Sequence, residues 1–78
     1  MKYEDYKKAE NLLAEQLHIE EIIKSYKWQM KHYGNIFVYN VNADGGNSPA
    51  SISERASLWV ITALEDYVKE LIQEIEEI

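Results

Sequence analysis

The chain lacks cysteine altogether and has only one proline and three glycines in 78 residues. Without cysteine it forms neither a disulfide nor a thiolate metal site, and a core of this size supplies only about 3 to 5 kcal/mol of stability. A partner chain is therefore the expected supplement. No apolar run approaches the roughly 18 residues of a membrane span, and residues 1–8 lack a basic segment followed by an apolar stretch. We predict a cytoplasmic protein without a secretion signal or membrane contact.

The few helix-breaking residues all fall in one window. All three glycines and the only proline lie between residues 34 and 49, and the segments on either side contain none. Glycine and proline interrupt regular structure, so the fold class is predicted to be all-α, an antiparallel helical hairpin with a short strand-like or β-hairpin insert. The predicted single domain, residues 1–78, consists of a helix at 3–33, an insert at 34–50 and a helix at 51–78.

Both predicted helices carry apolar residues at alternating spacings of three and four, the heptad pattern of helices that pack side by side. The seam positions are Leu12, Gln16, Ile19, Ile23, Tyr26, Met30 and Tyr33 in the first helix, and Ile61, Leu64, Val68, Leu71, Ile75 and Ile78 in the second. Leu13, Leu17 and Ile22 widen the first stripe, which predicts contact with more than one helix. Two such hairpins form a four-helix bundle, so we predict a homodimer or a higher oligomer.

The start of the second helix is distinctive. Ser51 followed three residues later by Glu54 matches a capping box. Between Leu58 and Leu64 only Thr62 is polar, and a helix that is apolar all round is normally buried on every side. A second chain is expected to cover it, with packing against the insert as the alternative. The predicted oligomer interface consists of Ile19, Ile23, Phe37, Val38, Trp59, Val60 and Leu64.

The insert contains one clear strand signal. Residues 36–41 are rich in β-branched and aromatic side chains, whereas residues 47–53 are poor strand formers. A lone strand leaves its backbone groups unpaired. The alternatives are an irregular hairpin within residues 36–52, with a turn near residues 42–46, and pairing with the same strand of a second subunit.

Charge is distributed unevenly along the chain, whose formal charge is -6. Residues 24–58 carry four basic residues against two acidic ones, whereas residues 1–23 carry three against six and residues 59–78 carry one against six. In an antiparallel hairpin the two acidic segments meet at one end. We therefore predict a basic end at the connection and an acidic end at the termini.

Cationic and aromatic residues gather near the predicted basic end. Such residues supply the cations and stacking surfaces of a site for a phosphate attached to a ring. The candidate ligand-binding residues are Lys24, Lys27, Trp28, Lys31, Tyr39, Arg55 and Trp59. The alternative is that the aromatic residues form core and the lysines only keep the protein soluble.

No catalytic set is evident in the sequence. His18 and His32 lie far apart on one helix, and there is no cysteine nucleophile. Glu15 and His18 have the Glu-x-x-His spacing of dimetal sites in helical bundles, but the inward glutamates that such a site needs are missing from the second seam. A solvated, salt-bridged face is favoured, and we predict no metal, no cofactor and no enzymatic activity.

The chain from Asp44 onward resembles a known group of phage proteins. The stretch Asp-Gly-Gly-Asn-Ser-Pro-Ala-Ser-Ile-Ser-Glu-Arg-Ala, followed by Leu64-Glu65-Asp66 and Glu74-Ile75, is similar to the helix-loop-helix region of small proteins related to the ArpU and RinA late-transcription activators. The chain carries no counterpart of their DNA-binding helix-turn-helix, so no direct reading of nucleic acid is expected. The resemblance implies a small phage or prophage accessory protein.

These patterns favour a non-enzymatic protein-interaction module, a phage or prophage regulator or inhibitor of a host protein that acts as a homo-oligomer. The alternative is a protein that binds or sequesters a nucleotide or another small anion at the basic end. A further alternative is an acidic DNA mimic, because one face of the second helix carries Asp66, Glu70, Glu74 and Glu77.

Overall fold

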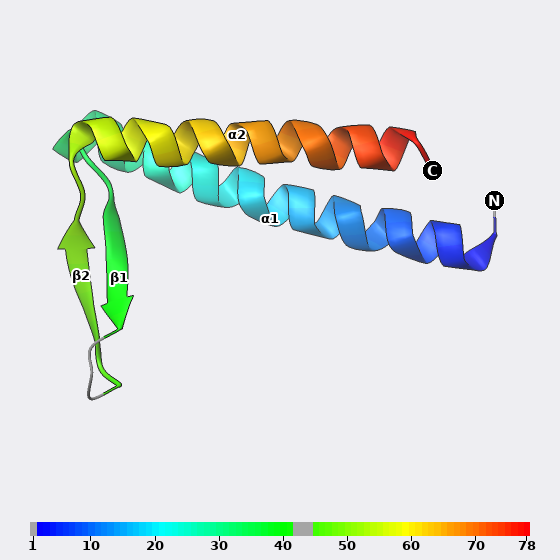
Figure 1. Ribbon diagram of the computed structural model, residues 1–78, viewed down its shortest axis with the longest axis horizontal. Helices are drawn as coiled ribbons and strands as arrows, with labels where there is room; N and C mark the ends of the chain where they lie inside the picture. Colours follow the sequence, from blue (N-terminus) through cyan, green and yellow to red (C-terminus); the bar gives the residue numbers. More distant parts are fainter. Residues whose placement is uncertain (1, 42–44) are drawn as a thin grey trace.

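Two long helices run antiparallel, and a short β-hairpin projects from the end where they are connected (Figure 1). The computed structural model of the chain describes residues 2–41 and 45–78, without the side chains of residues 39–41, 47 and 48. The elements in chain order are α1 (Tyr3–Tyr33), β1 (Phe37–Val41), β2 (Asn47–Ser51) and α2 (Glu54–Glu76). The prediction of a helical hairpin with a small β insert is confirmed.

Helix α1 ends at Gly34, as the clustering of glycine in the sequence suggests. Gly34 has a φ of 80°, in the left-handed region that favours glycine, and its N–H donates to the Met30 carbonyl at 3.0 Å. Lys31 and His32 lie in the last turn, where positive charge interacts favourably with the helix dipole. The chain therefore leaves α1 sharply and can start β1 within three residues.

Helix α2 begins three residues later than the sequence suggests. Its N-cap is Ser53, whose Oγ accepts a hydrogen bond from the Ala56 N–H at 3.1 Å. Ser51 does not cap the helix, because its backbone pairs with Phe37 as the last residue of β2. The predicted capping box at Ser51 is wrong for this reason, and the cap is a single serine without a matching glutamate.

Strands β1 and β2 pair with each other, so β1 has its partner within the chain. The register places Tyr39 opposite Pro49, and the Ile52 N–H donates to the Ile36 carbonyl at 3.1 Å. Because hydrogen-bonded and non-hydrogen-bonded pairs alternate in an antiparallel ladder, the nitrogen of Pro49 faces away from β1 and costs no ladder bond. The expectation that residues 47–53 form a poor strand is therefore wrong for β2. The predicted turn at 42–46 includes residues 42–44, which lie outside the described part of the chain.

The core is small and lies along the seam between the helices and at their connected end. The buried apolar residues within the described part of the chain are Ile23, Ile36, Ile61 and Leu71. Most other predicted seam positions are half-buried, whereas Tyr33 is exposed. The heptad pattern therefore holds along most of both helices, and a single hairpin buries it incompletely.

The molecule is extended. Its radius of gyration is 16.0 Å and its extents are 45 × 31 × 16 Å, whereas a compact domain of this length has a radius of gyration of about 11.5 Å. Its accessible surface is 6154 Å², and a folded monomer of this mass exposes about 4,900 Å². Among the described residues, neither helix has the length and apolar character needed to cross a membrane.

Candidate functional site

A corner formed by Gln29, Ile36, Ser53 and Ser57 fixes the β-hairpin to the helices. Ser57 Oγ accepts a hydrogen bond from the Ile36 N–H at 3.0 Å and donates one to the Ser53 carbonyl at 2.8 Å. Gln29 Oε1 accepts from the Phe37 N–H at 2.9 Å. Ile36 and Ser57 are both fully buried, so the corner joins both helices to the start of β1 and sets the direction of the projecting hairpin.

The two-helix layer has two different faces, each marked by one contact between the helices. On one face, Lys27 Nζ lies 3.0 Å from Glu65 Oε2. On the other, Tyr67 Oη donates a hydrogen bond to Glu15 Oε1 at 2.5 Å. Residues seven apart lie on the same side of a packed helix, and Gln29, which holds β1, is fourteen residues from Glu15. We call the side of Glu15 and Tyr67 the arm face, because the β-hairpin lies there, and the side of Lys27 and Glu65 the open face.

The open face carries large apolar side chains that the chain leaves exposed. Heptad steps from Lys27 lead to Leu13 and Tyr6, and single heptad steps from Glu65 lead to Leu58 and Ile72. Together with Leu17, which lies one turn from Leu13, these side chains are between 38% and 60% exposed. Large apolar side chains from both helices therefore lie along the open face.

A hollow lies at the end of the open face nearest the termini. Tyr6, Ala9, Glu10 and Leu13 of α1 and Ile75 of α2 line it. Four of these five residues are apolar or aromatic, and Glu10 places a carboxylate at the hollow. This combination suits an apolar side chain that arrives together with a positive charge.

A second hollow lies where α1 meets the β-hairpin, and aromatic rings surround it. Trp28, Tyr33, Phe37 and Pro49 are among its lining residues. The Tyr33 ring makes edge contacts with both the Trp28 and the Phe37 rings at centroid distances of 5.7 Å. Trp28 also lies 4.3 Å from the His32 ring, centroid to centroid. Trp28, Tyr33 and Phe37 therefore pack on each other while all three side chains remain exposed.

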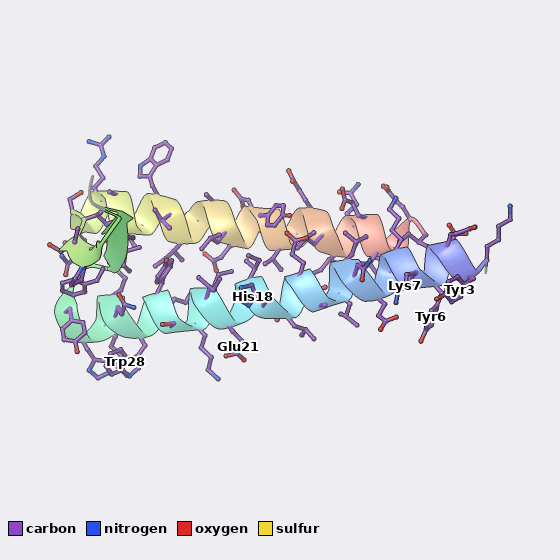
Figure 2. The ribbon with its side chains drawn as sticks, turned by 90° about the horizontal axis from the view of Figure 1, so that it is seen from below. Tyr3, Tyr6, Lys7, His18, Glu21 and Trp28 are labelled. Carbon is purple, nitrogen blue, oxygen red and sulfur yellow. The ribbon has the colours of Figure 1, made fainter. Side chains whose placement is uncertain are left out.

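The structure does not bring the predicted ligand-binding residues together. Trp28 lies on the side of α1 that faces away from α2 (Figure 2). Trp59 comes two residues after the buried Ser57, so helical geometry turns it away from α1 on the opposite outer edge, and it lines a separate hollow with Leu58 and Thr62.

The predicted cations are also dispersed. Lys27 is paired with Glu65, while Lys24, Lys31 and Arg55 are exposed and line neither of the two tryptophan hollows. The side chain of Tyr39 lies outside the described part of the structure. Among the described residues, no lysine or arginine lines the hollow beside Trp28, so an anion there would lack the cation that the prediction requires.

The predicted interface residues divide into two groups. Ile23 is buried within the single chain, and Ile19 and Leu64 lie half-buried in the seam between α1 and α2. These three contribute mainly to the packing of α1 on α2 and leave little surface for a second chain. Phe37 and Trp59 are exposed, and Val38 and Val60 are half-buried. The predicted interface set leaves out Tyr6, Leu58 and Ile72, although a second chain was expected to cover the apolar stretch that begins at Leu58. A search for apolar residues at multiples of seven could have added Ile72, which lies fourteen residues after Leu58.

The candidate chemistry along α1 is sparse. Glu15 accepts the hydrogen bond from Tyr67, and His18 and His32 are separated by about 21 Å of helix at 1.5 Å per residue. Within the described ranges, 2–41 and 45–78, no group of three or more histidine, aspartate and glutamate side chains could hold a metal ion. The contact with Glu15 raises the pKa of the Tyr67 phenol, and the nearby Glu74 and Glu70 carboxylates add to the shift.

Comparison of the chain with protein-family models, curated proteins and solved structures finds no match. The resemblance to phage late-transcription activators therefore stays a prediction from the sequence.

Proposed function

We propose that this chain is a non-enzymatic protein-interaction module that works as a homo-oligomer. The observation that carries the proposal is the surplus of accessible surface in the single chain, together with the large apolar side chains that it leaves exposed. The accessible surface of 6154 Å² exceeds that of a compact monomer of the same mass by about 1,200 Å². A stable protein interface of standard size buries about 800 Å² on each partner, so the surplus is large enough to form one.

The arrangement of the surplus supports the same proposal. Exposed apolar side chains scattered singly are normal on protein surfaces, but here Tyr6, Leu13, Leu58 and Ile72 share one face. The fully buried core consists of few residues. Small domains without disulfides or metals usually gain stability from oligomerisation, and this chain contains no cysteine.

The nucleotide-binding alternative has less support. Its aromatic residues lie on two separate edges, and one of its cations, Lys27, is paired with Glu65. No described contact brings the remaining lysines to an aromatic surface.

Sedimentation equilibrium across the micromolar range tests the proposal. We expect a mass that rises with concentration from the 9.2 kDa of one chain to at least twice that value. A single species at the monomer mass throughout the range would contradict the proposal.

A further inference from the structure

We propose that the open face binds a second copy of this chain, in a twofold dimer whose axis passes beside Leu17, so that Lys24 of each chain lies against the partner subunit's Glu10. The inference rests on the proposed function and adds the face, the orientation and the register of the contact. Three properties of the described residues lead to it: the shape of the open face, the distribution of charge, and the position of the hollow.

The shape of the molecule selects the face. The β-hairpin projects from the arm face (Figure 1), so two layers stacked through that face would have to accommodate two arms. The open face carries no such projection and bears Leu13, Leu17, Leu58 and Ile72, all exposed. Two helical layers can approach to the 8 to 10 Å that is usual for packed helices through the open face without moving any described backbone.

The charge distribution selects the orientation. A twofold axis parallel to the helices would place the basic connected ends of both chains together, and also their acidic ends. An axis across the helices instead places each basic end over the acidic end of the other chain. Residues 24–58 carry a net positive charge and the remaining segments a net negative one, so only the second arrangement is electrostatically complementary.

The length of α1 selects the register. Two layers overlap fully when the axis passes close to the middle of Tyr3–Tyr33, which lies beside Leu17. In a twofold contact, residue i meets j and j meets i. With the axis at Leu17, residues at equal distances on either side of it face each other, and position 10 faces position 24. These positions hold Glu10 and Lys24, which lie seven residues before and after Leu17 and so on the same side of α1.

The hollow provides an independent check of this register. Along the helices, the hollow lies at the height of Ala9 and Ile75. In the antiparallel overlap, the partner subunit's Leu58 and Lys24 lie at this height and face the hollow. Leu58 is exposed and lies on the open face. The apolar lining of the hollow would receive the leucine, and Glu10 at its edge would receive the lysine.

Single-cysteine variants test the axis directly, because the chain has no cysteine of its own. We expect Leu17→Cys to form a disulfide-linked dimer under mild oxidation, since two cysteines join when their Cα atoms approach within about 7 Å. Glu10→Cys alone should stay monomeric on a denaturing gel, whereas an equal mixture of Glu10→Cys and Lys24→Cys chains should form the mixed dimer. The control is Glu21→Cys, on the outer side of α1 (Figure 2).

Charge exchange tests the orientation without a covalent bond. Glu10→Lys and Lys24→Glu should each raise the dissociation constant of the dimer about tenfold, because each replaces two attractive contacts by two repulsive ones. The variant that carries both Glu10→Lys and Lys24→Glu should have a dimer dissociation constant within about threefold of the parent value. Glu21→Lys changes the net charge as Glu10→Lys does and should leave affinity unchanged. Circular dichroism at each variant confirms that the helices form.

The outcomes separate this inference from the proposed function. A dimer that neither cross-links through Leu17→Cys nor regains affinity in the charge exchange would overturn the open-face arrangement and leave the proposed function standing. A chain that remains monomeric at all concentrations would overturn both, and the open face would then be a contact for a different protein.

Discussion

The corner and the open face differ in how the fold covers their side chains. At the corner, Ile36 and Ser57 are fully buried and each has its hydrogen-bond partner. On the open face, Leu17 and Leu58 are more than half exposed. The corner therefore determines how one chain folds, whereas the open face holds apolar surface that only another molecule can cover. The stability of the chain at high dilution should depend on the corner. The part of the stability that grows with protein concentration should depend on the open face.

Replacing Ile36 should produce the largest effect and the sharpest contrast with Leu17. Ile36→Ala removes a fully buried side chain and should lower the free energy of unfolding by about 2 to 5 kcal/mol at every protein concentration. Leu17→Ala removes an exposed side chain and should cost no more than about 0.5 kcal/mol in the dilute monomer. Urea unfolding at two protein concentrations measures the free energy of unfolding of both variants.

Two further results complete this test. If Ile36→Ala does not fold, Ile36→Val should still fold and lose about 0.5 to 1.5 kcal/mol. If Leu17→Ala destabilises the dilute chain as much as the Ile36 variants do, the distinction between the two regions is wrong.

The polar part of the corner should give an intermediate effect. Ser57→Ala deletes the oxygen that accepts from the Ile36 N–H and leaves that buried donor unpaired, which should cost about 1 to 3 kcal/mol. Ser51→Ala is the matched control, since the Ser51 side chain is exposed and its removal should change stability by no more than about 0.5 kcal/mol. Thermal unfolding compares the two. A larger loss for Ser51→Ala would mean that Ser51 caps α2 after all.

The contrast also explains which parts of the fold the sequence reveals. The C-terminal end of α1 follows from local chemistry, because Gly34 supplies the left-handed residue that ends the helix. The start of α2 does not follow from local chemistry. Ser51 and Ser53 are both plausible caps by residue type, and pairing of Ser51 with Phe37 decides between them. That pairing is a contact between distant parts of the chain, which no short sequence pattern reports.

The candidate site was predictable only in part. Leu13 and Leu17 widen the apolar stripe of α1 visibly in the sequence, and this indicates a second contact. Which of the predicted interface residues stay exposed for a second contact depends on which side of α1 and of α2 faces the seam. The orientation of the two helices in the structure buries Ile23 and leaves Leu58 and Ile72 exposed. The similar distances of Trp28 and Trp59 from the predicted turn place them at the same end of the molecule. That they lie on opposite outer edges follows from which side of each helix faces the seam.

The arm face offers the smallest predicted effect, through the hydrogen bond from Tyr67 to Glu15. Because this contact raises the pKa of the phenol above its usual value of 10.0, the folded chain keeps the Tyr67 proton at a pH where the unfolded chain loses it. The contribution to stability is therefore complete below pH 10 and is lost as the pH rises through the folded-state pKa. Tyr67→Phe should remove this pH dependence.

Absorbance of phenolate measures the same contact directly. The difference between the titrations of the parent chain and Tyr67→Phe isolates one of the six tyrosines, and its midpoint should lie above 10. Glu15→Gln keeps a hydrogen-bond acceptor but removes the negative charge, so it should move that midpoint toward the ordinary value without abolishing the contact. A midpoint that stays unchanged in Glu15→Gln would show that Glu15 does not hold the Tyr67 proton, and that the two helices are not joined at this contact.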